Sequence, residues 1–121
     1  MEIPYTLAPG AYPPAPASPP SVSLSLYAAE EVTIPTFSRA SVPTGVSMAI
    51  PEGAMGSLGV EPGLVTTDTV NPGDSSEIIV HLLNTGPTVT FRPGCLVAGL
   101  MIHPDPHARF IKVDELPHRL P

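Results

Sequence analysis

The fold is decided by the stretch SSEIIVHLLNTGPTVTFRPGCLVAGLMI, residues 75–102. Its run EIIVHLLN (77–84) carries apolar residues at alternating positions on both of its sides. Because side chains of a strand point alternately to its two faces, this run predicts a central β-strand that is covered on two sides. The turn signals TGP and RPG separate it from two further apolar runs at 88–91 and 95–102, which predicts successive strands joined by tight turns.

The same pattern extends toward the N-terminus. The run SVSLSLYA (21–28) alternates valine and leucine with serine, and EEVTIP (30–35) is a second short candidate strand. Residues 39–58 indicate two strands separated by a kink at 43–45, and NPGD (71–74) has the composition of a turn. Strands at a spacing of about 8–12 residues, divided by turns, predict an all-β sandwich, jelly roll or barrel.

Composition narrows the fold and the function classes. The 121 residues suit one domain, and 18 prolines with 10 glycines favour short elements over long helices. The net charge is −6 and only 13% of residues are charged, so we expect no nucleic-acid partner, because such binding needs clustered cations. The single cysteine, Cys95, excludes an intrachain disulfide. Neither a signal peptide nor an apolar run of about 18 residues is present, and we therefore expect no membrane contact and an intracellular protein, cytoplasmic or nuclear.

The chain divides by composition into three parts. Residues 1–20 are dense in proline and predict a flexible N-terminal arm that packs little. Two interpretations stay open for this arm: a docking segment for protein partners, for which PPAP (13–16) is the candidate, or a plain disordered tail. Residues 21–103 form the predicted β core. Residues 104–121 form a polar C-terminal arm in which 109–114 are a candidate strand.

One short segment has the residue types of a metal site. HPDPH places His103, Asp105 and His107 at alternate positions, and imidazole and carboxylate groups can supply three ligands to a metal ion. The competing and favoured interpretation is a polar, proline-stiffened exit from the last core strand.

The loop before the central strand contains two candidates for acid–base chemistry. Asp68 and Asp74 could act as acid and base, but they lie in a Thr-, Gly- and Pro-rich segment, where a solvated turn is the favoured interpretation. His81 is interpreted as a core or interface histidine, and no glycine-rich phosphate loop leads into a helix.

Three segments together resemble a known family. IPTFSRASVPTGVSMAIPEGAMGSL (34–58), the stretch 75–102 and FIKVDELP (110–117) follow one another in the order and spacing of the trimeric dUTP diphosphatase (dUTPase) family, over roughly residues 21–118. The resemblance implies a distorted jelly roll of the β-clip type, a homotrimer, and hydrolysis of dUTP to dUMP and pyrophosphate with Mg²⁺. It also implies that the C-terminal arm packs on a neighbouring subunit.

At the positions where the resemblance implies catalytic and phosphate-binding residues, this chain carries other residues. Ser25 stands where the first motif has its aspartate, Glu61 and Pro62 stand before Gly63 where the second motif reads Arg-Ser-Gly, and Gly99 stands where the fourth has its glutamine. A carboxylate at position 61 would repel a triphosphate. The third-motif segment is short and has no tyrosine, and the chain ends about where the fifth motif would begin.

We therefore predict a dUTPase-like protein without dUTP-hydrolysing activity, which acts through protein–protein interaction or regulation. This prediction assigns no catalytic, substrate-binding or metal-binding residue and no cofactor. One alternative is an active dUTP diphosphatase with atypical motifs, using Mg²⁺ and either Asp68 or Asp74 as the base. The other is a trimeric structural or assembly module.

Overall fold

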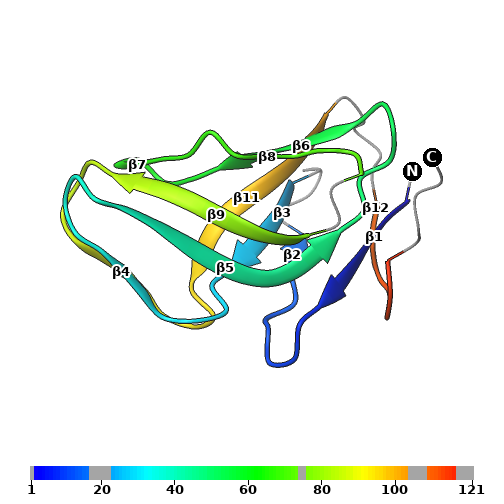
Figure 1. Ribbon diagram of the computed structural model, residues 1–121, viewed down its shortest axis with the longest axis horizontal. Helices are drawn as coiled ribbons and strands as arrows, with labels where there is room; N and C mark the ends of the chain where they lie inside the picture. Colours follow the sequence, from blue (N-terminus) through cyan, green and yellow to red (C-terminus); the bar gives the residue numbers. More distant parts are fainter. Residues whose placement is uncertain (1, 17–22, 74–75, 104–108, 117–121) are drawn as a thin grey trace.

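The computed structural model (Figure 1) describes residues 2–16, 23–73, 76–103 and 109–116, and its regular elements in these ranges are all β-strands. The strands are β1 (Glu2–Leu7), β2 (Ala15–Pro16), β3 (Ser23–Tyr27), β4 (Val32–Ile34), β5 (Arg39–Met48), β6 (Met55–Gly59), β7 (Leu64–Val65), β8 (Thr69–Val70), β9 (Glu77–Asn84), β10 (Val89–Phe91), β11 (Leu96–His103) and β12 (Arg109–Lys112). The predicted all-β class is confirmed. No helix in the described ranges is long and apolar enough to span a bilayer.

The strands form two five-stranded sheets and one two-stranded ribbon. The first sheet has the order β12-β1-β5-β9-β7, the second has the order β2-β3-β11-β6-β8, and β10 pairs with β4. Every pairing is antiparallel except the parallel pairing of β1 with β12. Buried residues from both sheets make one hydrophobic core, which is the arrangement of a jelly roll.

Strand β9 shows how the alternation of the sequence builds this core. Ile78, Val80 and Leu82 point inward and are at most 5% exposed. Their neighbours point outward, and Ile79 is 39% exposed. In its sheet β9 lies between β5 and the edge strand β7, so it is not the central strand. Within this chain only one of its faces is covered. The expected cover of its second face by another subunit stays a prediction.

The predicted kink at residues 43–45 is a bulge inside the single strand β5, where the register with β9 shifts between Pro43 and Ser47. Thr44 is fully buried, and its hydroxyl donates to the carbonyl of Ile78 at 2.6 Å. Gly45 has φ of 72°, and a Cβ there would overlap Ala11. Glycine is therefore required at position 45 by both backbone conformation and space.

The prediction of an N-terminal arm that packs little is wrong for residues 2–16. Strand β1 lies between β5 and β12, with Ile3 fully buried, and β2 pairs with β3. Proline does not prevent this, because it lacks a donor but keeps its carbonyl acceptor: the carbonyl of Pro4 accepts the N–H of Ala49 at 3.0 Å. Residues 17–20 lie outside the described ranges.

The expected short strand in the C-terminal arm is present as β12, and it pairs with β1 of the same chain. The N–H of Val113 extends this contact by donating to the carbonyl of Tyr5 at 2.7 Å. Packing of the arm on a neighbouring subunit stays a prediction.

Candidate functional site

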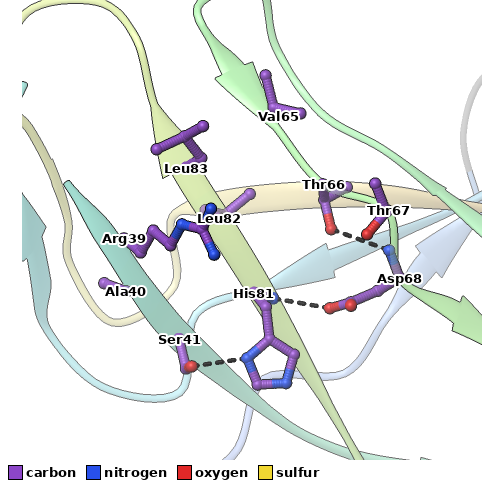
Figure 2. A pocket seen from close by; sticks show the side chains of 10 residues that line it. All are labelled: Arg39, Ala40, Ser41, Val65, Thr66, Thr67, Asp68, His81, Leu82 and Leu83. Atoms are coloured by element: carbon purple, nitrogen blue, oxygen red, sulfur yellow. Dashed lines mark hydrogen bonds between the residues drawn. The ribbon is translucent and has the colours of Figure 1, made fainter. Parts of the chain in front are cut away.

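A cavity of about 480 Å³ opens on the outer face of the first sheet, beside the segment that joins β7 to β8. Figure 2 shows the side chains that surround it. They come from the start of β5, from the end of β7, from the joining segment and from the second half of β9, and are Arg39, Ala40, Ser41, Val65, Thr66, Thr67, Asp68, His81, Leu82 and Leu83. Val65, Leu82 and Leu83 lie toward one end of the cavity together with Arg39, and Ser41, His81 and Asp68 lie toward the other.

Asp68 is the single carboxylate among these lining residues. Its Oδ2 accepts the backbone N–H of His81 at 2.8 Å, and its own N–H donates to Oγ1 of Thr66 at 3.3 Å. Strand β7 pairs with β9 only at Leu83 and Asn84. Two residues further along β9, the Asp68 carboxylate accepts the N–H of His81 in place of a backbone carbonyl from a neighbouring strand. Asp68 lies between β7 and β8, is partly buried and is bonded to β9, which differs from the solvated turn that the composition favours.

His81 and Ser41 face each other across the β5–β9 pair. The Oγ of Ser41 and the Nδ1 of His81 are 2.7 Å apart. Asp68 contacts the backbone of His81 and not its ring (Figure 2), so these three residues do not form the relay of a serine hydrolase, in which the acid orients the imidazole. Arg39 reaches across β9 from the side opposite Asp68 (Figure 2) and brings a positive charge to the cavity.

The other motif positions lie away from Asp68. In the second sheet Ser25 of β3 is opposite Gly99 of β11, and Gly99 is opposite Gly59 of β6. A Cβ added to Gly99 would meet nothing within 4 Å, so the glycine is not required by packing. Within one chain, the structure does not bring Ser25 and Gly99 together with Asp68.

Glu61, Pro62 and Gly63 form an exposed turn between β6 and β7. Gly63 has φ of 94°, and its carbonyl accepts both the N–H and the hydroxyl of Thr85, at 2.8 and 2.9 Å. The retained glycine therefore serves the backbone of the turn.

Three candidates lie outside the described residues: Asp74, Asp105 and His107. His103, at the end of β11, is exposed, and its Nε2 lies 2.9 Å from the hydroxyl of Ser57. In the described part of the chain, no group of three His, Cys, Asp or Glu side chains could hold a metal ion.

No pattern in the sequence indicates Arg39 and Ser41 as cavity residues. Both belong to a run whose alternation predicts only a strand, and their place beside His81 depends on the β5–β9 register, in which Ser41 is opposite His81 and Arg39 is opposite Leu83. Ser41 and His81 are 40 positions apart, about a third of the chain, and no local pattern encodes their pairing.

Known proteins resemble this chain in sequence. It is 38% identical over 98 residues to the deoxyuridine 5'-triphosphate nucleotidohydrolase of Bifidobacterium longum, which covers 72% of this chain and 62% of that protein. It is 37% identical over 112 residues to the protein of the same name from Leifsonia xyli, covering 84% of this chain and 74% of the relative. The chain thus spans about three fifths of the length of the Bifidobacterium relative. The sequence matches no protein-family model.

Solved structures resemble it in fold. The dUTPase of Staphylococcus bacteriophage 80alpha superimposes with a TM-score of 0.76 at 18% identity, over 97% of this chain and 95% of that one. The dUTPase from phage phi11 of S. aureus, whose structure is described as showing the coordination of a structural Mg(II) ion, gives 0.73 at 20% identity, over 93% and 92%. The fold is therefore the dUTPase-like jelly roll, and with the sequence relatives above, this chain belongs to the dUTPase family.

Proposed function

We propose that this chain hydrolyses dUTP to dUMP and pyrophosphate, with Asp68 as the base that activates the attacking water. The observation that carries the proposal is the placement of Asp68: a single carboxylate faces a cavity of about 480 Å³ and is oriented by a 2.8 Å bond to the N–H of His81. The relatives at 31–38% identity are named for this hydrolysis, and they favour it over the predicted loss of activity.

In this reaction water attacks the substrate directly, and the protein forms no covalent bond to it. The water oxygen forms a bond to the α-phosphorus of dUTP, and the proton of the water passes to the Asp68 carboxylate. The bond between the α-phosphorus and the bridging oxygen breaks, and that oxygen leaves with pyrophosphate. A positioned general base contributes about 10²–10⁴-fold to such a step. Arg39 would offset part of the negative charge of the triphosphate, since it lines the same cavity.

In the proposed reaction, Mg²⁺ binds together with the nucleotide. The described residues offer no three-ligand site of their own. Mg²⁺ is commonly held by substrate phosphates with only one or two carboxylates, so the phosphates of dUTP would be its main ligands here.

We also propose that the active form is a homotrimer. Ser25 and Gly99 lie in the second sheet and Asp68 beside the first, so a site that uses both regions needs more than one copy. The outward faces of β7 and β9 carry Val65 and Ile79 at 47% and 39% exposure, and contact with another subunit would remove this apolar surface from water. Light scattering tests this proposal: a monomer mass contradicts it.

The hydrolysis is tested by pyrophosphate release from dUTP with Mg²⁺. Wild type should turn over dUTP, and Asp68→Asn, which keeps the shape of the side chain but not its basicity, should be slower by roughly 10²-fold or more. Glu30→Gln removes an exposed carboxylate from the turn after β3 and is the matched control with unchanged turnover. Equal rates in the Asn variant and wild type would refute Asp68 as the base.

A second candidate function is a non-hydrolysing regulator of partner proteins. It is favoured by Ser25, Glu61 and Gly99, which lack the acid, cation and amide that the family resemblance implies at these positions. A wild-type protein that is folded and trimeric, yet releases no pyrophosphate from dUTP, would support this candidate. If such a protein also binds no partner, the remaining alternative is a trimeric structural module.

A further inference from the structure

Phe37 has an unusual backbone and an unusual exposure. Among the described residues it is the one non-glycine with positive φ, at 58°, and its side chain is 77% exposed. The other described positions with positive φ all carry glycine: Gly10, Gly45, Gly53, Gly63, Gly73 and Gly94. A bulky residue in the left-handed region is strained. Because the ring is mostly in water, the packing of this chain does not explain why phenylalanine stands there.

The turn that carries Phe37 is held rigidly at the end of β9. The N–H of Phe37 donates to the carbonyl of Asn84 at 2.6 Å, and the N–H of Asn84 donates to the carbonyl of Ser38 at 2.9 Å. The side-chain amide of Asn84, which is 2% exposed, donates to the carbonyls of Ile34 and Pro87 at 2.9 and 2.8 Å. The ring is therefore presented on a backbone that is fixed before any partner arrives, which lowers the entropy cost of binding.

Two further turns meet at the same end of the molecule, on the left in Figure 1 where β4, β5, β7 and β9 converge. Thr85 bonds to the carbonyl of Gly63 through both its N–H and its hydroxyl, which ties the turn at 61–63 to the turn at 85–87. We call the three turns 35–38, 61–63 and 85–87 the tip. Its exposed residues include Phe37, Pro35, Pro62 and Pro87, with Glu61 as an exposed acid.

From these observations we infer that the tip is a docking surface for another protein, with Phe37 as its anchor. Buried aromatic residues on rigid supports are the usual energetic centres of protein interfaces. The partner is a protein that presents an apolar socket for the ring, edged by lysine or arginine that faces Glu61.

Charge selects this partner over a second copy. The chain has a net charge of −6, so a cationic protein is attracted at long range, whereas a contact between two tips would bring two Glu61 side chains toward each other. The inference does not depend on hydrolysis of dUTP, because no residue of the tip lines the cavity that holds Asp68.

The test uses short random peptides displayed on phage and selected on the immobilised full chain. We expect the selected peptides to combine apolar residues with lysine or arginine. Phe37→Gly should weaken their binding by roughly tenfold or more, and Glu61→Gln should weaken it several-fold and reduce its dependence on salt. Leu96→Ala removes a side chain that is 49% exposed in the second sheet and should leave binding unchanged.

Weaker binding by Phe37→Gly would not result from misfolding. Glycine relieves the backbone strain at position 37, so this variant should unfold at a higher temperature than wild type. Failure to select any peptide, or equal binding to the Gly variant, overturns the docking surface. Light scattering distinguishes a cationic partner from a second copy of the chain. We expect the same mass for wild type and Phe37→Gly. A lower mass for the variant would assign the ring to a contact between copies and overturn the cationic partner.

Discussion

The carboxylate of Asp68 and the backbone N–H of His81 are joined by a hydrogen bond of 2.8 Å. This contact joins the segment between β7 and β8 to β9 and holds Asp68, the one carboxylate among the residues that line the cavity. The position of the candidate base is therefore determined by a backbone amide that belongs to the sheet.

The first prediction concerns this bond. Asp68→Ala removes the acceptor, so the His81 amide should exchange with deuterium faster than in wild type, because an amide that has lost its acceptor is protected less. Hydrogen exchange followed by mass spectrometry or NMR measures this change. Glu61→Ala, in the neighbouring turn, is the control with unchanged exchange at His81. Equal exchange in the Asp68 variant and wild type would mean that the bond does not form in solution.

A second prediction concerns Asn84. Its side chain is 2% exposed and bonds to the carbonyls of Ile34 and Pro87 and to the N–H of Gly86. Asn84→Ala leaves these buried groups without partners and should lower the free energy of unfolding by about 2–4 kcal/mol. Chemical denaturation measures the loss.

The matched control for that variant is Asn71→Ala, because Asn71 is exposed in the turn after β8 and surface changes of this kind alter stability by only about 0.5 kcal/mol or less. Similar losses in the two variants would contradict a structural role for the buried amide.

A third prediction concerns the strain at Phe37. Relief of the left-handed strain contributes about 1–2 kcal/mol, while the extra freedom of glycine in the unfolded chain costs about 0.5–1 kcal/mol. Phe37→Gly should thus raise the free energy of unfolding by up to about 1.5 kcal/mol, with a matching rise in Tm. Phe37→Ala keeps a Cβ at φ of 58° and should give no such gain. A less stable Gly variant would show that the ring stabilises the chain through its own contacts.

A fourth prediction tests the place of the N-terminal segment in the fold. Ile3 is fully buried in β1, between β5 and β12, so Ile3→Ala should cost about 2–4 kcal/mol of stability. Leu96→Ala, at a side chain that is 49% exposed, should cost much less. If Ile3→Ala unfolds like wild type in a denaturant titration, residues 2–7 behave as a free arm and the sheet order of the structure is wrong there.

Strands with clear alternation were predictable from the sequence, and those hidden by proline were not. In β3 the buried residues Leu24 and Leu26 are the ones that the period of two indicates. In β9 the period of two indicates a strand, but because both faces are apolar it does not say which face points inward. Strand β1 has a similar alternation in Ile3, Tyr5 and Leu7, but the density of proline around it favoured a disordered arm. The strands β5 and β12 that pair with β1 lie far along the chain, and local composition does not predict this pairing.

The candidate site was predictable only in part. Asp68 was identifiable as a carboxylate in the right segment, but its bond to the N–H of His81 depends on where β7 stops pairing with β9. Arg39 reaches the cavity through the β5–β9 register. The strain at Phe37 was not predictable from the sequence, because it results from the positive φ that the fold imposes on this residue.

The most direct test of the central claim measures dUTP hydrolysis and nucleotide binding on the same two proteins, wild type and Asp68→Asn. Binding is followed by calorimetry with a non-hydrolysable dUTP analogue and Mg²⁺, and hydrolysis by pyrophosphate release. If Asp68 activates water, the two proteins bind the analogue with similar affinity, and the variant releases pyrophosphate about 10²–10⁴-fold more slowly. A wild-type protein that neither binds the analogue nor releases pyrophosphate, or a variant that turns over as fast as wild type, contradicts the account.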